Sequence, residues 1–569
     1  MRNQDIAKIF YEIADMYEIK GENPFRVRAY RRAAQNIENL AEDIEKVIKD
    51  RKKIPGIGQD LMQKIKEILK KGTCKTYEEL KKEIPPSLLE LLAIPGVGPR
   101  TAKLIYDHFK VTSLDELERL CLEHKIQSLP GVRVKTEENI LKGIQLVRKG
   151  RERRPLGLIL PLAEEIIEIL KKRCPIDRID VAGSVRRRKE TVKDIDILVC
   201  SSNPWQVMEE FVNLPFASEI IAHGITKSSI RTQDGLQIDL RVVEKECYGA
   251  ALCYFTGSKE HNIRIRELAI KKGLKINEYG IFEGEKRIGG KEEEEVFRAV
   301  DLPYIPPELR EDRGEIEAAM EGKLPKLVEM EEIKGDLHVH SKYSDGTATL
   351  GEIAEKARKM GLEWIAICDH SQSLKVAKGV SIEDLRRKRK EIDEFNRKSD
   401  VKLLCGTEVD ILNDGSLDYP NEILKEMDFV VAAIHTGFKQ DKATLTKRII
   451  KAMENPYVHS IAHPTGRVIG ERDPYPLDIE KVFEKAVATG TCLEINAYYK
   501  RLDLNDVLSH AAKNKGIKVT IGTDAHLLDQ IEFLRLGVFV ARRGWLEKKD
   551  ILNTLTYKEL IKFLKRNKN

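Results

Sequence analysis

The sequence lacks long hydrophobic runs, although 41% of its 569 residues are hydrophobic. No stretch approaches 18 consecutive apolar residues, so no transmembrane helix is predicted. The first residues, Met1–Asp5, also lack the apolar run of a signal peptide. The hydrophobic content is nevertheless sufficient for packed cores and excludes a wholly disordered chain. We therefore expect a cytoplasmic protein without a membrane partner, divided into roughly three to five compact units.

Cysteine and net charge are also scarce. The nine cysteines follow no regular framework, which favours reduced cytosolic thiols over disulfides. The 99 basic and 93 acidic residues leave a net charge of +6. Residues 1–150 hold 29 basic and 23 acidic residues, whereas residues 151–569 hold 70 of each. Because the whole excess lies in the N-terminal quarter, we interpret that region as a module that faces nucleic acid.

Two Pro-containing boundaries, near Arg148–Pro155 and Tyr304–Pro307, divide the chain. Before the first, apolar residues at helical spacing predict an all-helical region. Between the two, short β-branched runs alternate with helices and predict an α+β unit. Residues 311–332 then carry eight acidic and three basic residues, and we interpret them as a solvated linker.

From Lys334 onward, apolar strand-like runs alternate regularly with helical segments. The runs are Trp364–Cys368, Lys402–Cys405, Phe429–Ile434, His459–Ala462, Thr491–Ile495 and Lys518–Gly522. This rhythm predicts a parallel α/β domain, most simply a barrel.

A Pro-Gly turn recurs three times in the helical region, at Ile54–Gly58, Ile94–Gly98 and Leu129–Arg133. Glycine allows close backbone approach, and the N–H groups that begin the following helix favour anions. One copy alone could be a simple helix connection, but repetition in a basic region predicts contact with a nucleic-acid backbone. In the third copy Arg133 replaces the second glycine, so we expect that turn to be structural only. The turns resemble helix-hairpin-helix motifs of DNA repair proteins, which implies DNA contacts and a monovalent cation at Gly56, Gly58, Gly96 and Gly98.

Three aspartates lie in two strand-like runs, Asp194–Val199 and Leu236–Val243. Asp194 and Asp196 share one face of a strand because they are two residues apart, and Asp239 adds a carboxylate from the second run. Three carboxylates on adjacent strands can hold two hard cations for in-line phosphoryl transfer. The alternative is that the first pair merely faces solvent. A glycine for close phosphate approach and two donors for a triphosphate precede the pair: Gly183, Ser184 and Arg187.

The following segments favour the catalytic alternative: Tyr254–Ser258, Asn262, Arg266 and Ile276–Tyr279. In this order, and with the hairpins, residues 1–315 resemble the family X DNA polymerases. The resemblance implies a palm with two Mg²⁺ or Mn²⁺ ions held by Asp194, Asp196 and Asp239. It implies contacts with an incoming dNTP from Gly183, Ser184, Arg187, Tyr254, Gly257 and Asn262. With gapped or primer–template DNA as the partner, it implies DNA contacts from Arg241 and Arg266.

Two positions depart from the family pattern. Gln237 stands where members often carry a basic residue. Lys64 aligns with the lysine that forms a Schiff base with an abasic sugar in some relatives, but Asp60 replaces their phosphate-binding lysine. Because an anion there weakens phosphate binding, two readings remain open: a lyase supported by Arg26 and Tyr30, or a surface lysine on an amphipathic helix.

Eight of the twelve histidines lie between positions 338 and 526, and nearly all follow a strand-like run. A lone histidine after a strand is usually a structural polar residue. Recurrence at successive strand ends instead places these side chains at the carboxyl end of a barrel, where active sites form. Imidazoles together with carboxylates suit Zn²⁺, Mn²⁺ or Fe²⁺. We therefore predict a multinuclear metal site.

Residues 334–569 resemble a PHP (polymerase and histidinol phosphatase) domain. The resemblance implies nine ligands, enough for about three metal ions: His338, His340, Asp345, His370, Glu408, His435, His463, Asp524 and His526. A complete set indicates an active hydrolase, since degenerate PHP domains tend to lose ligands. His459 and His510 fall outside the motifs and are interpreted as structural. Arg467 has two equal readings, as a phosphate contact or as a surface residue.

The combined pattern predicts a multidomain chain: a first helical DNA-binding domain (1–85), a second (86–150), a catalytic palm (151–248), a nucleotide-selecting subdomain (249–315), a linker (316–333) and a distorted TIM-like PHP barrel (334–569). The resemblance implies monomeric, DNA-directed gap filling in base excision repair. It also implies a PHP 3′→5′ exonuclease, with AP endonuclease or 3′-phosphatase activity. Two alternatives remain: a phosphoesterase recruited to DNA by a catalytically minor polymerase half, and a non-enzymatic DNA-end scaffold.

Overall fold

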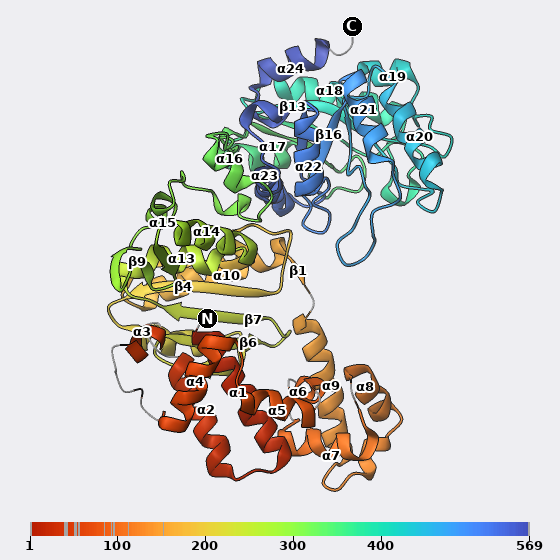
Figure 1. The fold of residues 1–569 in the computed structure, drawn as a ribbon. Coiled ribbons are helices and arrows are strands. Elements are labelled where there is room, and N and C mark those ends of the chain that lie inside the picture. Colours follow the sequence, from red (N-terminus) through yellow and green to blue (C-terminus); the bar gives the residue numbers. More distant parts are fainter. Residues whose placement is uncertain are drawn as a thin grey trace. The chain divides into compact units, whose positions relative to one another are not determined.

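The chain forms two compact units. The computed structural model describes residues 3–38, 44–49, 54, 57–84, 86–92, 94, 97–111, 113–151 and 153–566. The first unit comprises Met1–Arg154, Pro161–Arg186 and Thr191–Tyr304, and the second comprises Pro155–Leu160, Arg187–Glu190 and Ile305–Asn569 (Figure 1). Within the described ranges, no helix combines the length and the apolar character needed to cross a membrane.

The described part of the N-terminal region is helical, as its apolar spacing predicts. Its helices are α1 (Asn3–Lys20), α2 (Pro24–Glu38), α3 (Ile44–Lys49), α4 (Gln59–Lys71), α5 (Lys75–Glu83), α6 (Pro86–Leu91), α7 (Pro99–Phe109), α8 (Leu114–Leu122) and α9 (Val134–Arg151). Buried apolar side chains from α1 to α9, among them Phe10, Ile65 and Ile144, form one continuous core. The two hairpin-bearing parts of this region are therefore packed together.

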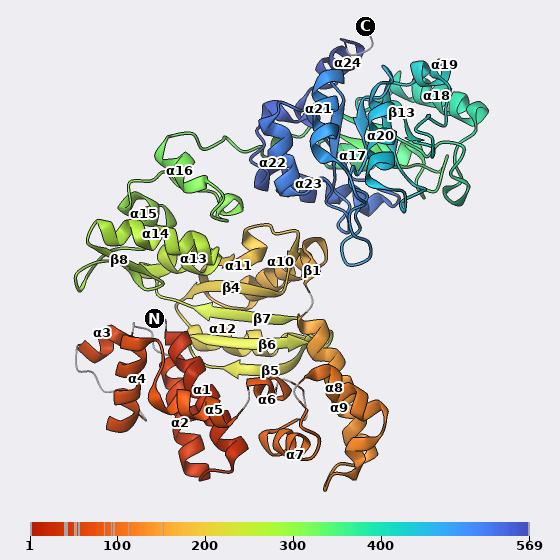
Figure 2. The same cartoon turned by 45° about the vertical axis from the view of Figure 1, so that its right-hand side comes forward.

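A five-stranded sheet follows, in the order β2-β4-β7-β6-β5. Its strands are β2 (Ile176–Val181), β4 (Asp194–Ser201), β5 (Ala217–His223), β6 (Lys227–Thr232) and β7 (Gln237–Val242). The central pair β4 and β7 is parallel, and the other pairs are antiparallel. Along β7, half-buried and buried residues alternate, so Asp239 lies on the less buried face. Helices α10 (Leu156–Arg173), α11 (Gly183–Arg186) and α12 (Pro204–Val212) accompany the sheet (Figure 2).

The rest of the first unit is built from short elements. These are α13 (Tyr248–Thr256), α14 (Lys259–Lys271), α15 (Glu293–Ala299) and a three-stranded antiparallel sheet of β8 (Leu274–Asn277), β9 (Gly280–Glu283) and β10 (Lys286–Gly289). A further two-stranded sheet pairs β1 (Arg154–Pro155) with β3 (Thr191–Val192).

The second unit contains the predicted parallel barrel. Seven parallel strands lie in sequence order: β11 (Gly335–Val339), β12 (Trp364–Ile367), β13 (Lys402–Asp410), β14 (Phe429–Ala433), β15 (Ser460–Ile461), β16 (Cys492–Asn496) and β17 (Val519–Gly522). A parallel bridge between Val339 and Ala525 joins the ends of the first and last strands, so the sheet nearly closes. The barrel prediction is therefore confirmed, with seven strands.

Helices lie on the outside of the barrel strands (Figures 1 and 2). They are α17 (Leu350–Lys359), α18 (Ile382–Asn396), α19 (Asn421–Glu426), α20 (Lys442–Met453), α21 (Ile479–Thr489), α22 (Asp506–Asn514), α23 (Leu534–Arg543) and α24 (Tyr557–Arg566). Every residue of β11, β12, β14, β16 and β17 is buried, as expected for parallel strands covered on both faces.

The acidic segment before the barrel is more buried than its charge indicates. It contains α16 (Glu315–Met320), whose Glu315 and Ile316 are fully buried, and Val328 belongs to the barrel core. The Glu315 carboxylate accepts hydrogen bonds from the backbone N–H groups of Asp312 and Arg313. Val328 thus anchors the end of this segment in the barrel core, and the buried Glu315 carboxylate is satisfied by donors within the segment itself.

Candidate active sites

Strand register brings together the three aspartates of the sheet, here called the palm triad (Asp194, Asp196 and Asp239). In the parallel pairing of β4 with β7, Asp196 lies directly opposite Asp239 and Asp194 lies opposite Gln237. Burial and the charge of Asp239 raise the pKa of Asp194. Crowded, partly buried carboxylates of this kind are stabilised by divalent cations.

Close packing explains Gly183 beside the triad. Gly183 has φ = +57°, and a Cβ atom there would lie 2.2 Å from Asp196 Oδ2. Only glycine fits this position without displacing the carboxylate. Gln237, which departs from the family pattern, donates its side-chain amide to both Asp239 oxygens, at 3.0 and 3.2 Å. It therefore orients the third carboxylate.

The predicted nucleotide contacts on α13 and α14 are linked to one another. Asn262 Nδ2 donates to the carbonyl oxygen of Tyr254 at 2.7 Å, and Arg266 Nε donates to the carbonyl oxygen of Asn262 at 3.2 Å. Gly257, between the two helices, has φ = +71°. Arg241 lies 4.8 Å from the ring centroid of Phe255, a cation–π contact.

Ser184 and Arg187, the two predicted phosphate donors, belong to different compact units. Ser184 is half-buried within α11. Arg187 belongs to the second unit, where its Nε lies 3.1 Å from Glu311 Oε1. Burial raises the pKa of Glu311, but Arg187 and Arg543 outweigh burial and lower it. In this conformation the Arg187 guanidinium is therefore engaged by a carboxylate.

The hairpin glycines fall into two classes. Gly58 and Gly98 directly precede α4 and α7 and have φ of −80° and −81°. No atom of the described residues lies within 4 Å of the position that a Cβ would take at either glycine. The described part of the chain therefore does not require glycine there. Gly131, in the third copy, has φ = +82°, which favours glycine for the turn itself. Gly56 and Gly96 lie outside the described residues.

Lys64 lies on α4 beside an acid. Its Nζ is 2.5 Å from Asp60 Oδ1, one turn earlier, and its side chain is 14% exposed. An abasic sugar would have to displace Asp60 to reach this amine.

The nine predicted metal ligands converge at the carboxyl ends of the barrel strands, and we call them the barrel cluster. Three groups of side chains have ligand atoms within 4.8 Å of one another: His340–Asp345–His370–His526, His338–His340–Asp524 and His370–Glu408–His435. The remaining member, His463, has Nε2 3.0 Å from Glu408 Oε1. Among the described residues the palm triad forms no group of this kind.

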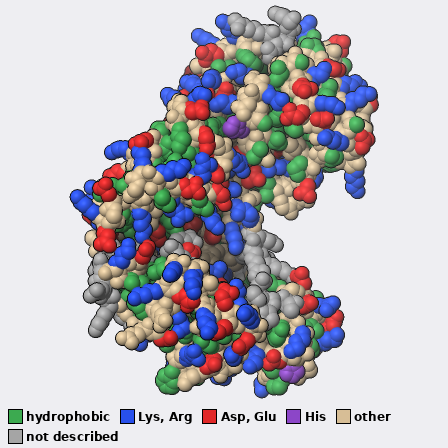
Figure 3. Space-filling model, in the orientation of Figure 1, with side chains coloured by type: hydrophobic (Ala, Val, Ile, Leu, Met, Phe, Trp, Pro, Cys, Tyr) green, Lys and Arg blue, Asp and Glu red, His purple; other side chains and the backbone are tan. Residues whose placement is uncertain are grey.

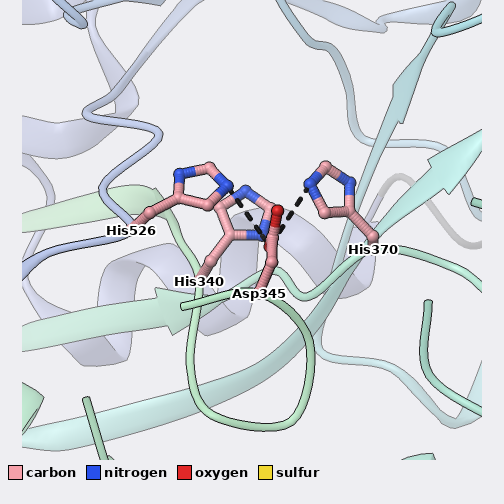
Figure 4. Close-up of side chains that lie close together, drawn as sticks. All are labelled: His340, Asp345, His370 and His526. Carbon is pink, nitrogen blue, oxygen red and sulfur yellow. Dashed lines mark ion pairs between the residues drawn. The ribbon is translucent and has the colours of Figure 1, made fainter. Parts of the chain in front are cut away.

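The most open group is centred on Asp345. Its Oδ1 lies 3.3 Å from His526 Nε2 and 3.7 Å from His370 Nε2. Figure 4 shows this carboxylate between the two rings, with His340 beside it. On the molecular face in Figure 3, little histidine is visible, in agreement with the burial of His338, His340 and His463.

The donor set fits metal ions. Among the described residues, the buried His340 Nδ1 and His463 Nδ1 have no hydrogen-bond partner, and His370 Nδ1 lies 2.7 Å from Glu408 Oε2. Burial, together with His370 and His526, lowers the pKa of His340 to about 3, so this imidazole is neutral at neutral pH. Neutral imidazoles with buried carboxylates are the ligands that Zn²⁺, Mn²⁺ and Fe²⁺ prefer.

Further carboxylates hold the ring nitrogens on the far side of the histidines, and the sequence motifs did not reveal them. His338 Nδ1 lies 2.7 Å from Glu494 Oε1, and His435 Nδ1 lies 2.5 Å from Asp410 Oδ1. Such contacts fix the tautomer and orientation of a metal-binding imidazole. Asp410 follows Glu408 by two residues on β13, a spacing that could have indicated it. Glu494 is 156 residues from His338, so no local signal existed.

A buried ion pair joins the segments that carry three members of the cluster, His340, Asp345 and His370. Lys388 Nζ, from α18, is 2.9 Å from Asp369 Oδ2, and both side chains are fully buried. Asp369 also accepts from the backbone N–H of Ser341 and the hydroxyl of Ser344, both at 2.8 Å. The loop that carries Asp345 is thereby fastened to the strand end that carries His370.

The structure gives contacts for His459 and His510, which are predicted to be structural, and for Arg467, which is predicted to be either a phosphate contact or a surface residue. His459 Nδ1 accepts from the backbone N–H of Val430 at 3.0 Å, and His510 packs 4.9 Å from the Trp545 ring. Arg467 is largely buried rather than superficial, and it donates to the carbonyl oxygens of Arg501 and Leu502 and to the Glu190 carboxylate.

Family models match most of these parts. A DNA polymerase beta thumb model matches residues 251–311, a helix-hairpin-helix domain 1–74, a SAM-like helix-hairpin-helix tandem 88–145 and a PHP domain 336–506. Together with the palm triad and the barrel cluster, these matches define a polymerase beta-like protein that carries a PHP domain.

A full-length relative fixes the family. The DNA polymerase/3′-5′ exonuclease PolX of Bacillus subtilis (strain 168) is 40% identical over 572 residues, which cover 100% of both chains. The chain therefore belongs to the family X DNA polymerases with a C-terminal PHP domain. A probable phosphatase of Thermoanaerobacter sp. (strain X514) is 33% identical over 232 residues, covering 38% of this chain and 89% of that protein.

Among solved structures, a ternary complex of Leishmania infantum polymerase beta covers 40% of this chain and 98% of its own. The sequence identity is 24% and the TM-score is 0.31, too low to support an inference.

Proposed function

We propose that this chain extends DNA 3′ ends at the palm triad and removes nucleotides from 3′ ends at the barrel cluster. The observation that carries the proposal is that one chain combines both sets of side chains: Asp196 opposite Asp239 with Asp194 beside them, and nine converging histidines and acids. A full-length relative named DNA polymerase/3′-5′ exonuclease supports both halves. Filling of short gaps in base excision repair is the setting that suits both activities.

The palm triad would hold two Mg²⁺ or Mn²⁺ ions, and the barrel cluster about three Zn²⁺, Mn²⁺ or Fe²⁺ ions. When bound, such ions neutralise phosphate charge and activate the attacking oxygen. In extension, the primer 3′-oxygen bonds to the α-phosphorus of a dNTP while the bond to pyrophosphate breaks. Gly183 leaves room for the phosphates, and Gln237 keeps Asp239 oriented.

The remaining palm residues would position the nucleotide. Ser184 donates to the triphosphate, and Tyr254, Gly257 and Asn262 form one linked surface against the sugar and base. Arg187 binds a phosphate only when its ion pair with Glu311 breaks. On the template side, Arg241 and Arg266 contact DNA.

The hairpins would hold DNA by its backbone. Gly58 and Gly98 are open and unstrained, so close approach of an external surface accounts for them better than the fold does. Gly56 and Gly96 belong to the same turns, where a monovalent cation would also bind. We assign no lyase chemistry to Lys64, because Asp60 occupies its ammonium. The active form is a cytoplasmic monomer with six segments, divided at residues 85, 150, 248, 315 and 333.

The test follows a labelled one-nucleotide-gap substrate with and without dNTPs. Asp239→Asn should abolish extension and retain 3′-end degradation, whereas His340→Ala should do the reverse. Glu260→Gln, an exposed acid on α14, is the matched control and should retain both activities.

Other outcomes identify the alternatives. Degradation without extension in the wild-type protein would favour a phosphoesterase recruited to DNA by its polymerase half. Binding of DNA ends with neither activity would favour a scaffold. Loss of both activities in each variant would overturn the assignment of one reaction to each site. AP endonuclease and 3′-phosphatase activities are assayed on the same variants and should depend on His340 alone.

A further inference from the structure

The loop that follows His370 of the barrel cluster is fixed at its base. It spans residues 371–380, and we call it the braced loop. Its first and last residues, Ser371 and Val380, form a parallel bridge, and the backbone N–H of Val380 donates to the carbonyl oxygen of His370 at 2.9 Å. Gly379 packs so tightly that a Cβ there would lie 1.9 Å from the carbonyl oxygen of Ser371. The two ends of the loop are therefore locked together beside the cluster.

Ser373 ties the loop to a carboxylate that supports the cluster. Its hydroxyl donates to Asp410 Oδ2 at 2.9 Å, and its backbone N–H donates to Asp418 Oδ2 at 2.7 Å. Asp410 is the acid that holds His435 Nδ1. Since an extended chain covers at most about 3.6 Å per residue, residues 375 and 376 lie within roughly 11 Å of Ser373. The tip of the loop therefore stays close to the rim of the cluster.

Three exposed side chains form this tip: Lys375, Val376 and Lys378. Val376 is 89% exposed, more than any other large hydrophobic side chain among the described residues. Neither lysine side chain has an ion pair or a hydrogen bond with a described residue. Lys378 has φ = +55°, a left-handed conformation that is unfavourable for a residue with a Cβ. No contact within the described residues accounts for these side chains, and two unpaired cations beside an apolar group suit a ligand with phosphates and bases.

The burial of the cluster limits the form in which DNA can reach it. His338, His340 and His463 are almost fully buried, whereas Asp345 and His526 remain 30% and 31% exposed. Because the ligand atoms lie below the surface, a DNA 3′ end reaches them as one strand, without its complement. The nucleotides behind that end then lie at the rim, where the braced loop is.

We propose that the braced loop binds the strand behind the 3′ end that is hydrolysed at the barrel cluster. Lys375 and Lys378 contact phosphates of this strand, and Val376 packs against its sugars and bases. The inference rests on the proposed 3′-end hydrolysis at that cluster. A lysine ammonium is a compact point charge that binds phosphate oxygens without reading sequence. Phosphates of one strand follow one another by about 3.4 Å along the helix axis, so a reach of roughly 11 Å places the contacts in about the last three nucleotides.

The first test combines Lys375→Gln with Lys378→Gln in the full-length protein. On a single strand, each phosphate contact contributes about 0.7 to the slope of log affinity against log salt concentration. KM for 3′-end degradation should therefore rise by about 25-fold at 0.1 M salt, and the difference from wild type should vanish near 1 M salt. The value of kcat should be unchanged, because the metal ligands are untouched.

The second test locates the strand without turnover. All nine native cysteines are buried, so Val376→Cys supplies one exposed thiol for a photoactivatable aryl azide. The labelled protein is irradiated with DNA whose last 3′ linkages are phosphorothioates, which resist hydrolysis. We expect cross-links to about the last three nucleotides of the 3′ strand.

The matched control removes two charges at the other end of the barrel strands. Lys398 and Lys425 are exposed and precede the starts of β13 and β14. Lys398→Gln with Lys425→Gln should leave KM unchanged. Gap filling, which uses the palm triad, and the melting temperature should be unchanged in all these variants.

Three results would overturn the proposal: an unchanged KM in the loop variant, an equal rise in KM in the control variant, and the absence of cross-links near the 3′ end. If the wild-type protein does not degrade DNA, the proposed function fails instead. The cross-linking experiment still judges the loop in that case, because it requires no hydrolysis.

Discussion

Single atoms decide the geometry of the palm triad. A Cβ on residue 183 would collide with the Asp196 carboxylate, and the side-chain amide of Gln237 donates hydrogen bonds to both carboxylate oxygens of Asp239. Gly183 and Gln237 carry no charge, yet they fix the positions of the charged carboxylates of the palm triad. Displacement of a catalytic group by about 1 Å can lower a rate by about 100-fold.

Gly183→Ala should therefore lower single-nucleotide gap filling by about 100-fold. The added methyl group must push Asp196 away from Asp239, and it also strains a backbone with φ = +57°. Extension is measured under single-turnover conditions. Gly284→Ala is the matched control, because Gly284 has φ = +59° but open space around its Cβ. Equal losses in both variants would mean that backbone strain, and not the contact with Asp196, causes the defect.

At the scale of elements, the hairpins separate two uses of glycine. Gly58 and Gly98 directly precede helices, with ordinary backbone angles and no described atom near the position of a Cβ, whereas Gly131 adopts the left-handed conformation. The proposed function therefore assigns the first two to contact with DNA, while the backbone of the turn accounts for the third.

Gly58→Ala should weaken binding to gapped DNA by several-fold and leave thermal stability unchanged. The added methyl group would meet no atom of the described residues, so its effect should fall on the proposed contact with the DNA backbone. Gly131→Ala should do the opposite: it should lower the free energy of unfolding by about 1 kcal/mol and retain DNA affinity. Fluorescence anisotropy and thermal melting measure the two effects. A common loss of stability would show that Gly58 serves the fold.

The buried pair of Lys388 and Asp369 connects helix α18 to the strand ends. Lys388→Met leaves Asp369 as an unpaired buried charge, which should cost about 3–5 kcal/mol. Urea unfolding followed by the fluorescence of Trp364, which is fully buried in the barrel, measures the loss. Addition of Asp369→Asn to Lys388→Met should restore part of the stability. A loss below about 1 kcal/mol would show that Asp369 is satisfied by its serine donors alone.

At the scale of the whole molecule, metal binding at the barrel cluster should stabilise the second unit. The barrel cluster gathers ligands from strands far apart in the sequence, so it exists only in the folded barrel. Mn²⁺ at 100 times its dissociation constant should add about 2.7 kcal/mol to that unit. Differential scanning calorimetry of chelator-treated protein, with and without Mn²⁺, measures the shift. Removing two ligands by Asp345→Ala with His370→Ala should abolish most of it, and an undiminished shift would place the ions elsewhere.

The sequence patterns predicted the catalytic and metal-binding residues better than the residues that hold them in place. The palm triad and the barrel cluster were predictable because most members lie in or directly after strand-like runs, and because the resemblance to known families implied the complete ligand sets. Glu494 and Lys388 were not predictable, since each contacts a partner far away in the sequence. Lys388, moreover, lies in a charge-rich helix whose sequence resembles a solvated face. The charge of the acidic segment before the barrel likewise predicts a solvated linker, although Glu315 is buried. A charged side chain can thus be expected at the surface only where the fold offers it no buried ion-pair or hydrogen-bond partner.

The discontinuity of the second unit has a practical consequence for dissecting this enzyme. Its residues include Pro155–Leu160 and Arg187–Glu190 as well as everything from Ile305 onward. Gly157 fits tightly against Tyr499 and Leu536, and the Arg188 guanidinium lies 4.5 Å from the Phe539 ring centroid. A gene truncated before Ile305 would leave these apolar surfaces uncovered. The nuclease half is therefore better inactivated by point substitution than removed by truncation.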